Sequence, residues 1–220
     1  MKKKLGFALA GITAMLIGGG QANATVCIPM PTGDGSEPFS ALGAGVCVQA
    51  GDKLFSNFNF GNLPKAHGTV TFDLEVIDGN ENHSITFTDN LPGGPTYKFS
   101  YDVAVTLPGS PIVALSADFT QSRGGSTTLT ETTAPTGAGS IDIVKDTVNK
   151  MIVVSGTNEI DYSPGTMSLD VMESLDVATN SDVSAVLNTV VQDVAEPASL
   201  GLLGVALLGF GAIRRRRKAA

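Results

Sequence analysis

Apolar and polar residues alternate along several stretches of this chain, and the alternation predicts β-strands. The pattern is clearest at 69–76 and 97–105. A period of two sends successive side chains to opposite faces, so each stretch is expected to form a half-buried antiparallel strand. The apolar residues expected to face inward are Val70, Phe72, Leu74 and Val76 in the first stretch, and Tyr97, Phe99, Tyr101, Val103 and Val105 in the second.

Further strands are predicted between clusters of Gly, Pro, Asn and Asp, because these residues favour turns. An early strand begins at Val46 and Val48, turns at Gly51 and Asp52, and is followed by core residues Phe55, Phe58 and Phe60. The remaining predicted strands are 84–88, with Ile85 and Phe87 inward, 112–120, 126–132, 141–144, 150–155 and 166–171. Their spacing of roughly ten to fifteen residues predicts an all-β fold, an antiparallel β-sandwich of the jelly-roll or immunoglobulin-like kind.

Three regions lack a clear period. The stretch 29–45 is rich in Pro, Gly and Ser and is expected to be a loop. Turns are expected at 78–82 and 90–95. After Val171 the alternation weakens, and we expect a last strand at 174–178 and a short helix from Asp182, capped by Ser181 or Asn180.

The N-terminus has the three parts of a secretory signal peptide. Three lysines at 2–4 precede an apolar run at 5–17, and Ala22-Asn23-Ala24 forms a small-x-small cleavage site. The sequence therefore predicts a signal-peptide helix over residues 1–24, cleavage after Ala24 and export by the Sec machinery. Residues 1–24 and the C-terminal segment 194–218, described below, are not part of the predicted fold. The remaining residues 25–193 are long enough for one sandwich domain.

The chain has two cysteines, Cys27 and Cys47. In an exported protein an even pair predicts a disulfide, whereas metal ligation would need more Cys or His nearby. A bridge closing a loop of about 20 residues would stabilise the domain by roughly 3 kcal/mol on the chain-entropy model. We therefore predict a disulfide between Cys27 and Cys47.

The C-terminus, residues 194–218, also has three parts. Glu196 and Pro197 precede an uncharged apolar run at 198–213, which is followed by the basic tail 214–218. As a helix, about 16 residues would extend roughly 24 Å, a little less than a bilayer's hydrocarbon core. Pro is tolerated in the first turn of a helix, and clustered cations stay on the cytoplasmic side. The tail therefore predicts a transmembrane helix with the domain outside the cytoplasm.

This layout resembles the PEP-CTERM sorting signal of Gram-negative bacteria, with Ala195 where that signal has its first proline. The residues that carry the resemblance are Glu196, Pro197, the apolar run, Arg214, Arg215, Arg216 and Arg217. The resemblance implies processing by an exosortase, transient anchoring in the inner membrane, and a final place at the cell surface or outside the cell. It also implies association with exopolysaccharide or biofilm. An ordinary C-terminal membrane anchor is the alternative for the same residues.

Charge narrows the possible partners of the exported domain. The chain has a net charge of −7, but eight of its 14 cations lie in the two terminal segments, so residues 25–193 keep 6 cations and 20 acids and carry about −14. Such a charge repels nucleic acid and anionic lipid surfaces. Trp is absent and aromatic residues make up 6% of the chain, which offers little for stacking on sugars.

No catalytic motif of the common hydrolase, metalloprotease or P-loop types occurs in the sequence. His67 and His83 lie beside turn signals and are expected to be solvated, as are most of the acids. The acidic stretch 73–82 could supply oxygens to Ca²⁺, but we favour a polar hairpin turn there. We therefore expect no enzymatic activity, no cofactor and no metal. The predicted function is a non-catalytic surface or matrix protein; the alternative is a carbohydrate-binding module or adhesin, with calcium as an optional aid.

Overall fold

The computed structural model describes residues 26–193, apart from gaps at 31–32, 44, 65–66, 78–79, 107–109, 123, 136, 138 and 149–150. The predicted signal peptide with Ala24 lies outside the described residues. So do Glu196, Pro197, the predicted membrane helix and the arginines 214–217. In the part of the chain that is described, no helix is long and apolar enough to span a membrane.

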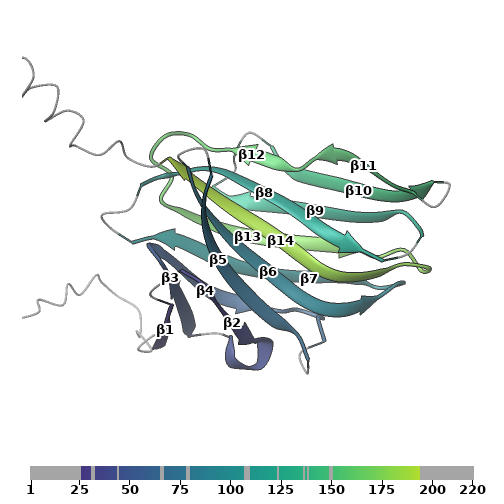
Figure 1. The fold of residues 1–220 in the computed structure, drawn as a ribbon, viewed down its shortest axis with the longest axis horizontal. Helices are drawn as coiled ribbons and strands as arrows, with labels where there is room; N and C mark the ends of the chain where they lie inside the picture. Colours follow the sequence, from purple (N-terminus) through teal and green to yellow (C-terminus); the bar gives the residue numbers. More distant parts are fainter. Residues whose placement is uncertain are drawn as a thin grey trace, which may run out of the picture.

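Two β-sheets packed face to face make up the described residues (Figure 1). Strands β1 and β3 are parallel, and every other pair of neighbours is antiparallel. A short 3-10 helix at Phe39–Ala41 follows β2. The eight-stranded sheet has the order β1 (Val26–Met30), β3 (Val46–Ala50), β4 (Lys53–Asn59), β7 (Thr96–Val105), β13 (Ser168–Asp176), β9 (Thr127–Ala134), β10 (Ile141–Val148) and β11 (Met151–Thr157). The six-stranded sheet has the order β12 (Glu159–Asp161), β8 (Ile112–Gln121), β14 (Asp182–Asp193), β6 (Asn80–Pro92), β5 (Thr69–Ile77) and β2 (Gly35–Pro38).

The hydrophobic core lies between the two sheets, as the alternating pattern predicts. Aromatic rings join the sheets: Phe87 of β6 lies 4.8 Å from Phe99 of β7, and Phe55 of β4 lies 5.1 Å from Phe72 of β5, between ring centroids. Ring pairs at such distances add about 0.5–1.5 kcal/mol beyond the burial of their area. The prediction of an all-β sandwich is therefore confirmed.

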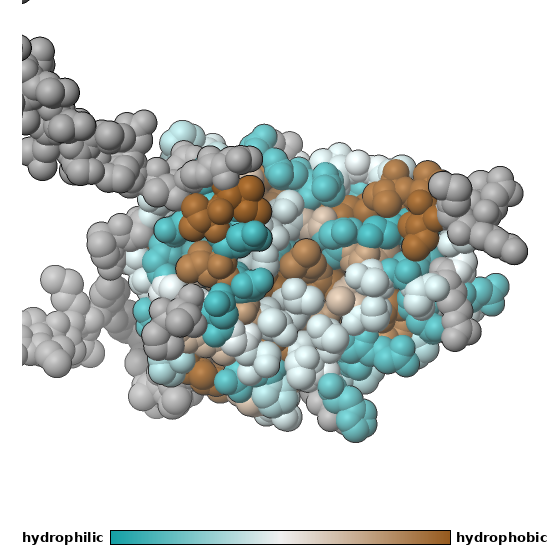
Figure 2. Space-filling view, in the orientation of Figure 1, coloured by the Kyte–Doolittle hydropathy of each residue, from teal (hydrophilic) through white to brown (hydrophobic). Residues whose placement is uncertain are grey.

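Most of the alternating residues occupy the predicted faces, but the C-terminal end of β5 is not buried. Val70 and Phe72 are buried, Leu74 is half-buried, and Val76 is 63% exposed. The expectation that Val76 is buried is thus wrong, because β5 runs on beyond the covered part of the core. Figure 2 shows apolar surface beside this end of β5 and beside β11, an edge strand on which Ile152, Val153 and Val154 are also exposed.

From Asp182 onward the structure has a strand in place of the predicted helix, and this is the largest difference from the predicted elements. β14 is a strand of 12 residues that pairs with β6 on one side and β8 on the other. The register shifts between Val183 and Ala185, and the inward positions after it include the polar residues Asn188 and Gln192. These two features obscure the period of two.

Other predicted boundaries also change. The separate strands expected at 166–171 and 174–178 are one strand, β13, with Glu173 on its inward face. The stretch 29–45, expected to be a loop, holds part of β1, all of β2 and the 3-10 helix. β6 continues to Pro92, so the turn expected at 90–95 begins only at Gly93. For the strands, pairing with a neighbouring strand extends the element beyond its local signal.

Candidate functional site

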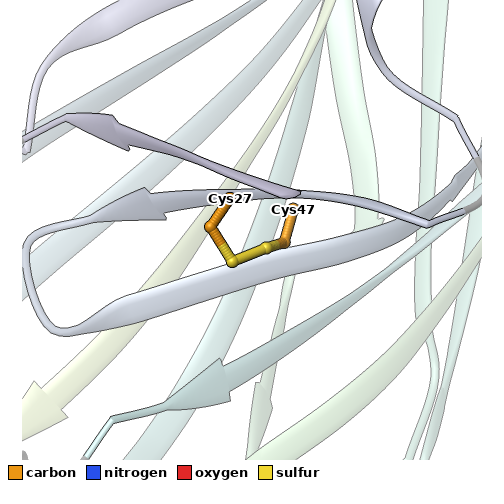
Figure 3. The surroundings of a disulfide bond; sticks show 2 residues. All are labelled: Cys27 and Cys47. Carbon is orange, nitrogen blue, oxygen red and sulfur yellow. A yellow bond between two sulfur atoms is a disulfide. The ribbon is translucent and has the colours of Figure 1, made fainter. Parts of the chain in front are cut away.

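A disulfide joins Cys27 to Cys47, as predicted (Figure 3). The two residues are direct neighbours in the register of the parallel strands β1 and β3, with Cα atoms 4.4 Å apart. In the structure the bridge fastens β1, the first described strand and an edge strand of the eight-stranded sheet, to its neighbour β3. Its place is therefore structural, at the start of the domain.

Five polar side chains lie in contact with one another at one end of the described sandwich. We call this group the end cluster. Its members come from both sheets, so they meet only when the sandwich has formed. Asp52 lies in the turn between β3 and β4, and Lys53 is the first residue of β4. The other members are Glu81 and His83 of β6 and Gln192 of β14.

The turn that carries Asp52 is held in place by its backbone. Ala50 pairs with Lys53, which leaves Gly51 and Asp52 as a two-residue hairpin loop. Gly51 has φ 59°, a left-handed conformation that glycine adopts without a steric penalty. The backbone N–H and the hydroxyl of Thr106 donate to the Asp52 carbonyl at 2.7 and 2.9 Å. The Asp52 carboxylate is consequently fixed near β6.

His83 lies inside the sandwich, so the prediction that it is solvated is wrong. It is 1% exposed, while His67 is exposed in a turn as predicted. The sequence did contain the signal, because extending the period of two backward from Phe87 and Ile85 places His83 on the same inward face. The neighbouring turn residues masked that pattern.

The imidazole of His83 faces two carboxylates. Nε2 lies 3.3 Å from Oδ1 of Asp52 and 3.6 Å from Oε2 of Glu81. Neither ring nitrogen has a hydrogen-bond partner among the described residues. Burial, aided by the nearby Lys53 ammonium, lowers the pKa of His83 to about 4, so the ring is neutral at pH 7.

Lys53 balances the acids of the cluster. Its side chain is fully buried, and its ammonium donates to Oδ1 of Asp52 and to Oε1 of Gln192. Gln192 in turn donates to Oδ2 of Asp52 at 3.3 Å and to the Ser110 carbonyl. Burial lowers the pKa of Lys53, against the opposing effect of Asp52. The side chains of Asp52 and Glu81 are 25% and 40% exposed, so the cluster opens to solvent on its acidic side.

The acidic stretch 73–82, weighed as a calcium loop, forms a hairpin. Ile77 pairs with Asn80 across the turn, so the preferred prediction of a hairpin is confirmed. The turn is shorter than the predicted 78–82, because β6 begins at Asn80, and residues 78–79 lie outside the described part of the chain. Asp73 and Glu75 are exposed on β5. Of the described acids in this stretch, Glu81 reaches the end cluster, a contact that was not predicted from the sequence.

A second polar group, which we call the carboxyl pair, lies deeper between the sheets. Glu131 of β9 and Glu173 of β13 are direct partners in the sheet register and are 0% and 3% exposed. Asn188 of β14 donates to Oε1 of Glu173 and to the Tyr101 hydroxyl. Burial raises the pKa of Glu131 to about 8 and that of Glu173 well above its usual value. Both carboxyls therefore hold their protons at neutral pH.

The expectation that acids lie outward or in turns is wrong for this pair. Glu131 follows Leu129, and Glu173 stands between Val171 and Leu175, at positions that a period of two places inward. The signal was present, but a lone acid within an apolar alternation is easily taken for the end of a strand. Asn188 bonds to Glu173, whereas neither carboxyl oxygen of Glu131 has a hydrogen-bond partner among the described residues. The neutral, protonated form is the one that such a desolvated position favours.

The family model of the PEP-CTERM protein-sorting motif matches residues 193–217. No curated protein matches the chain. This is therefore a protein with a C-terminal protein-sorting signal. The signal is of the PEP-CTERM type, which indicates an exported protein that an exosortase processes.

Proposed function

We propose that the sandwich is non-catalytic cargo of the exosortase pathway. Export by the Sec machinery carries it across the inner membrane of a Gram-negative bacterium, where the tail holds it until the exosortase removes the signal. The domain then resides at the cell surface or in the extracellular matrix, in association with exopolysaccharide. The observation that carries this proposal is the sorting motif at residues 193–217.

The junction between domain and signal supports processing without loss of the fold. The motif begins at Asp193, the last residue of β14, so almost no linker separates the two. β14 lies in the middle of the six-stranded sheet and pairs along its length with β6 and β8. Cleavage near Pro197 would therefore leave this strand, and with it the core, complete in the released domain.

One hollow of the described surface supports a binding role better than catalysis. A hollow of about 600 Å³ lies beside the 3-10 helix, and its lining has no titratable side chain. The lining residues are Phe39, Ser40, Leu42, Gly43, Asn57, Phe58, Asn59 and Phe60. The charge of about −14 on residues 25–193 keeps the domain soluble and away from anionic lipid.

The same hollow bears on the alternative, a carbohydrate-binding module. Asn57, Asn59 and Ser40 could bind sugar hydroxyls, which favours this function. The rings of Phe39, Phe58 and Phe60 are buried, however, so the hollow offers no open aromatic face for stacking. A glycan array with and without chelator distinguishes the two functions: cargo without lectin activity gives no specific signal in either condition.

Intact-mass measurement of the exported protein tests the proposal. In a strain with the exosortase, the extracellular form should lack residues beyond about Pro197, and without the enzyme the protein should stay membrane-bound with its tail. A variant with Glu196→Ala and Pro197→Ala should keep the tail even when the exosortase is present. An extracellular form that still carries Arg214 to Lys218 would contradict the proposal.

A further inference from the structure

We propose that Asp52, Glu81 and His83 bind one divalent transition-metal ion, with Zn²⁺ as the best fit. The ion would join the hairpin of the eight-stranded sheet to β6 of the six-stranded sheet. This inference does not depend on the proposed function, because it rests on the geometry of the end cluster.

The three residues already have the spacing of metal ligands. One ligand atom from each lies within 4.8 Å of the other two. Zn²⁺ binds His nitrogen and carboxylate oxygen at about 2.0–2.2 Å, which places two ligands of a tetrahedral ion roughly 3.3–3.5 Å apart. The distances of 3.3 and 3.6 Å from Nε2 of His83 to the two carboxylates are close to these values. The imidazole is therefore placed for an ion that it would share with the two carboxylates.

His83 supplies an independent reason to expect a ligand at this point. A buried imidazole whose nitrogens form no hydrogen bond is destabilising, and native proteins leave few such groups. The neutral ring has a lone pair on one nitrogen, and in the structure Nε2 is the nitrogen that faces both carboxylates. A metal ion between Nε2 and the carboxylates would give Nε2 the partner that it lacks.

The ligand types favour zinc over calcium. Imidazole nitrogen suits Zn²⁺ and its transition-metal neighbours, whereas Ca²⁺ takes six to eight oxygens. The cluster offers one imidazole and two carboxylates, and three protein ligands with an open fourth position are common for Zn²⁺. The partial exposure of Asp52 and Glu81 leaves that fourth position, and the path of entry, on the solvent side.

Lys53 competes with the ion, and this competition makes the proposal testable. The ammonium donates to Oδ1 of Asp52, the oxygen that also lies nearest to Nε2 of His83. A bound cation would take this oxygen and repel the ammonium, which could retain its hydrogen bond to Gln192. Removing the charge of Lys53 should therefore strengthen metal binding, whereas removing a ligand should weaken it.

Calorimetric titration of ZnCl₂ into the full chain, purified in mild detergent and stripped with EDTA, tests the site. The unmodified protein should bind one Zn²⁺, and EDTA should reverse the binding. His83→Gln, Asp52→Asn and Glu81→Gln should each weaken binding by at least about tenfold. Lys53→Met should tighten it by about tenfold, and the matched control His67→Gln, at an exposed position, should leave it unchanged.

Three results would overturn the proposal: no binding of Zn²⁺ by the unmodified protein, equal affinity in His83→Gln, or weaker binding in Lys53→Met. If His83→Gln does not fold, the affinity of Glu81→Gln for Zn²⁺ tests the site instead. The Glu81 side chain is 40% exposed, so its loss leaves the core intact. Thermal unfolding of the unmodified protein gives a second readout, since a ligand specific to the native state raises the Tm with concentration. An unchanged Tm at saturating Zn²⁺ would also count against the site.

Discussion

The end cluster and the carboxyl pair both lie between the two sheets, but they differ in their access to solvent and in how their charges are paired. The end cluster combines a cation with two acids and reaches solvent through Asp52 and Glu81. The carboxyl pair brings two acids together where solvent does not reach. Desolvation penalises a charge in both places. At the edge of the core charges are kept by pairing, while in the interior they are avoided because the carboxyls keep their protons.

The two groups consequently respond to pH in opposite directions. The pKa of Glu131 is higher in the folded protein than in the unfolded chain, so its contribution to stability is complete below about pH 4.5 and is lost as pH rises through about 8. The pKa of His83 is lower in the folded protein, so its contribution is complete above about pH 6.5 and is lost as pH falls through about 4. Stability should therefore be greatest in weakly acidic solution.

The largest expected effect comes from ionising the carboxyl pair. Between pH 5 and pH 9 the free energy of unfolding should fall by on the order of 5 kcal/mol, since each unit of pKa difference corresponds to about 1.4 kcal/mol. Urea unfolding at a series of pH values measures this fall.

A double variant, Glu131→Gln with Glu173→Gln, isolates the pair. Glutamine has the shape of a protonated glutamate, so the variant should match the original at pH 5 and be the more stable protein at pH 9. Asp170→Asn, at an exposed position of β13, is the matched control and should leave the pH dependence unchanged. A double variant that loses stability with pH as steeply as the original would disprove the role of the pair.

The next largest effect should be the loss of stability at low pH that comes from His83. In the Glu131→Gln, Glu173→Gln background with EDTA present, the free energy of unfolding should fall by roughly 3 kcal/mol between pH 7 and pH 4, because the unfolded chain binds a proton that the buried ring does not. Adding His83→Gln should reduce this fall in the free energy of unfolding, and adding His67→Gln should not. Equal curves for the two variants would mean that His83 titrates normally.

Loss of the buried cation in the end cluster should have a smaller effect. Lys53→Met should lower the free energy of unfolding by about 2 kcal/mol at pH 7 without metal, because it removes the ammonium that donates to Asp52 and Gln192. The partial exposure of Asp52 limits the cost. Lys98→Met, at an exposed position of β7, should change stability by less than about 0.5 kcal/mol. Equal effects of the two substitutions in chemical unfolding would show that Lys53 is not paired in solution.

Much of the fold could be predicted from the sequence because the signals are local. The alternation at 97–105 gives β7 its bounds and faces, and a pair of cysteines near the start of an exported domain gives the disulfide. The tail is likewise a local pattern, and the family model confirms it at residues 193–217. β14 could not be predicted, because a register shift and two polar inward residues interrupt its pattern and only its pairing on both sides defines it.

The sequence by itself determined the strands with regular alternation, the cysteine partners and the sorting signal, since each depends on residues close together in the chain. Only the tertiary structure decided which polar side chains meet in the core. Lys53 bonds to Gln192 across 139 positions, and Glu131 faces Glu173 because β9 and β13 are neighbours in the sheet. The physical reason is that strand order, which is set by packing of the whole sandwich, brings together groups that no local pattern relates.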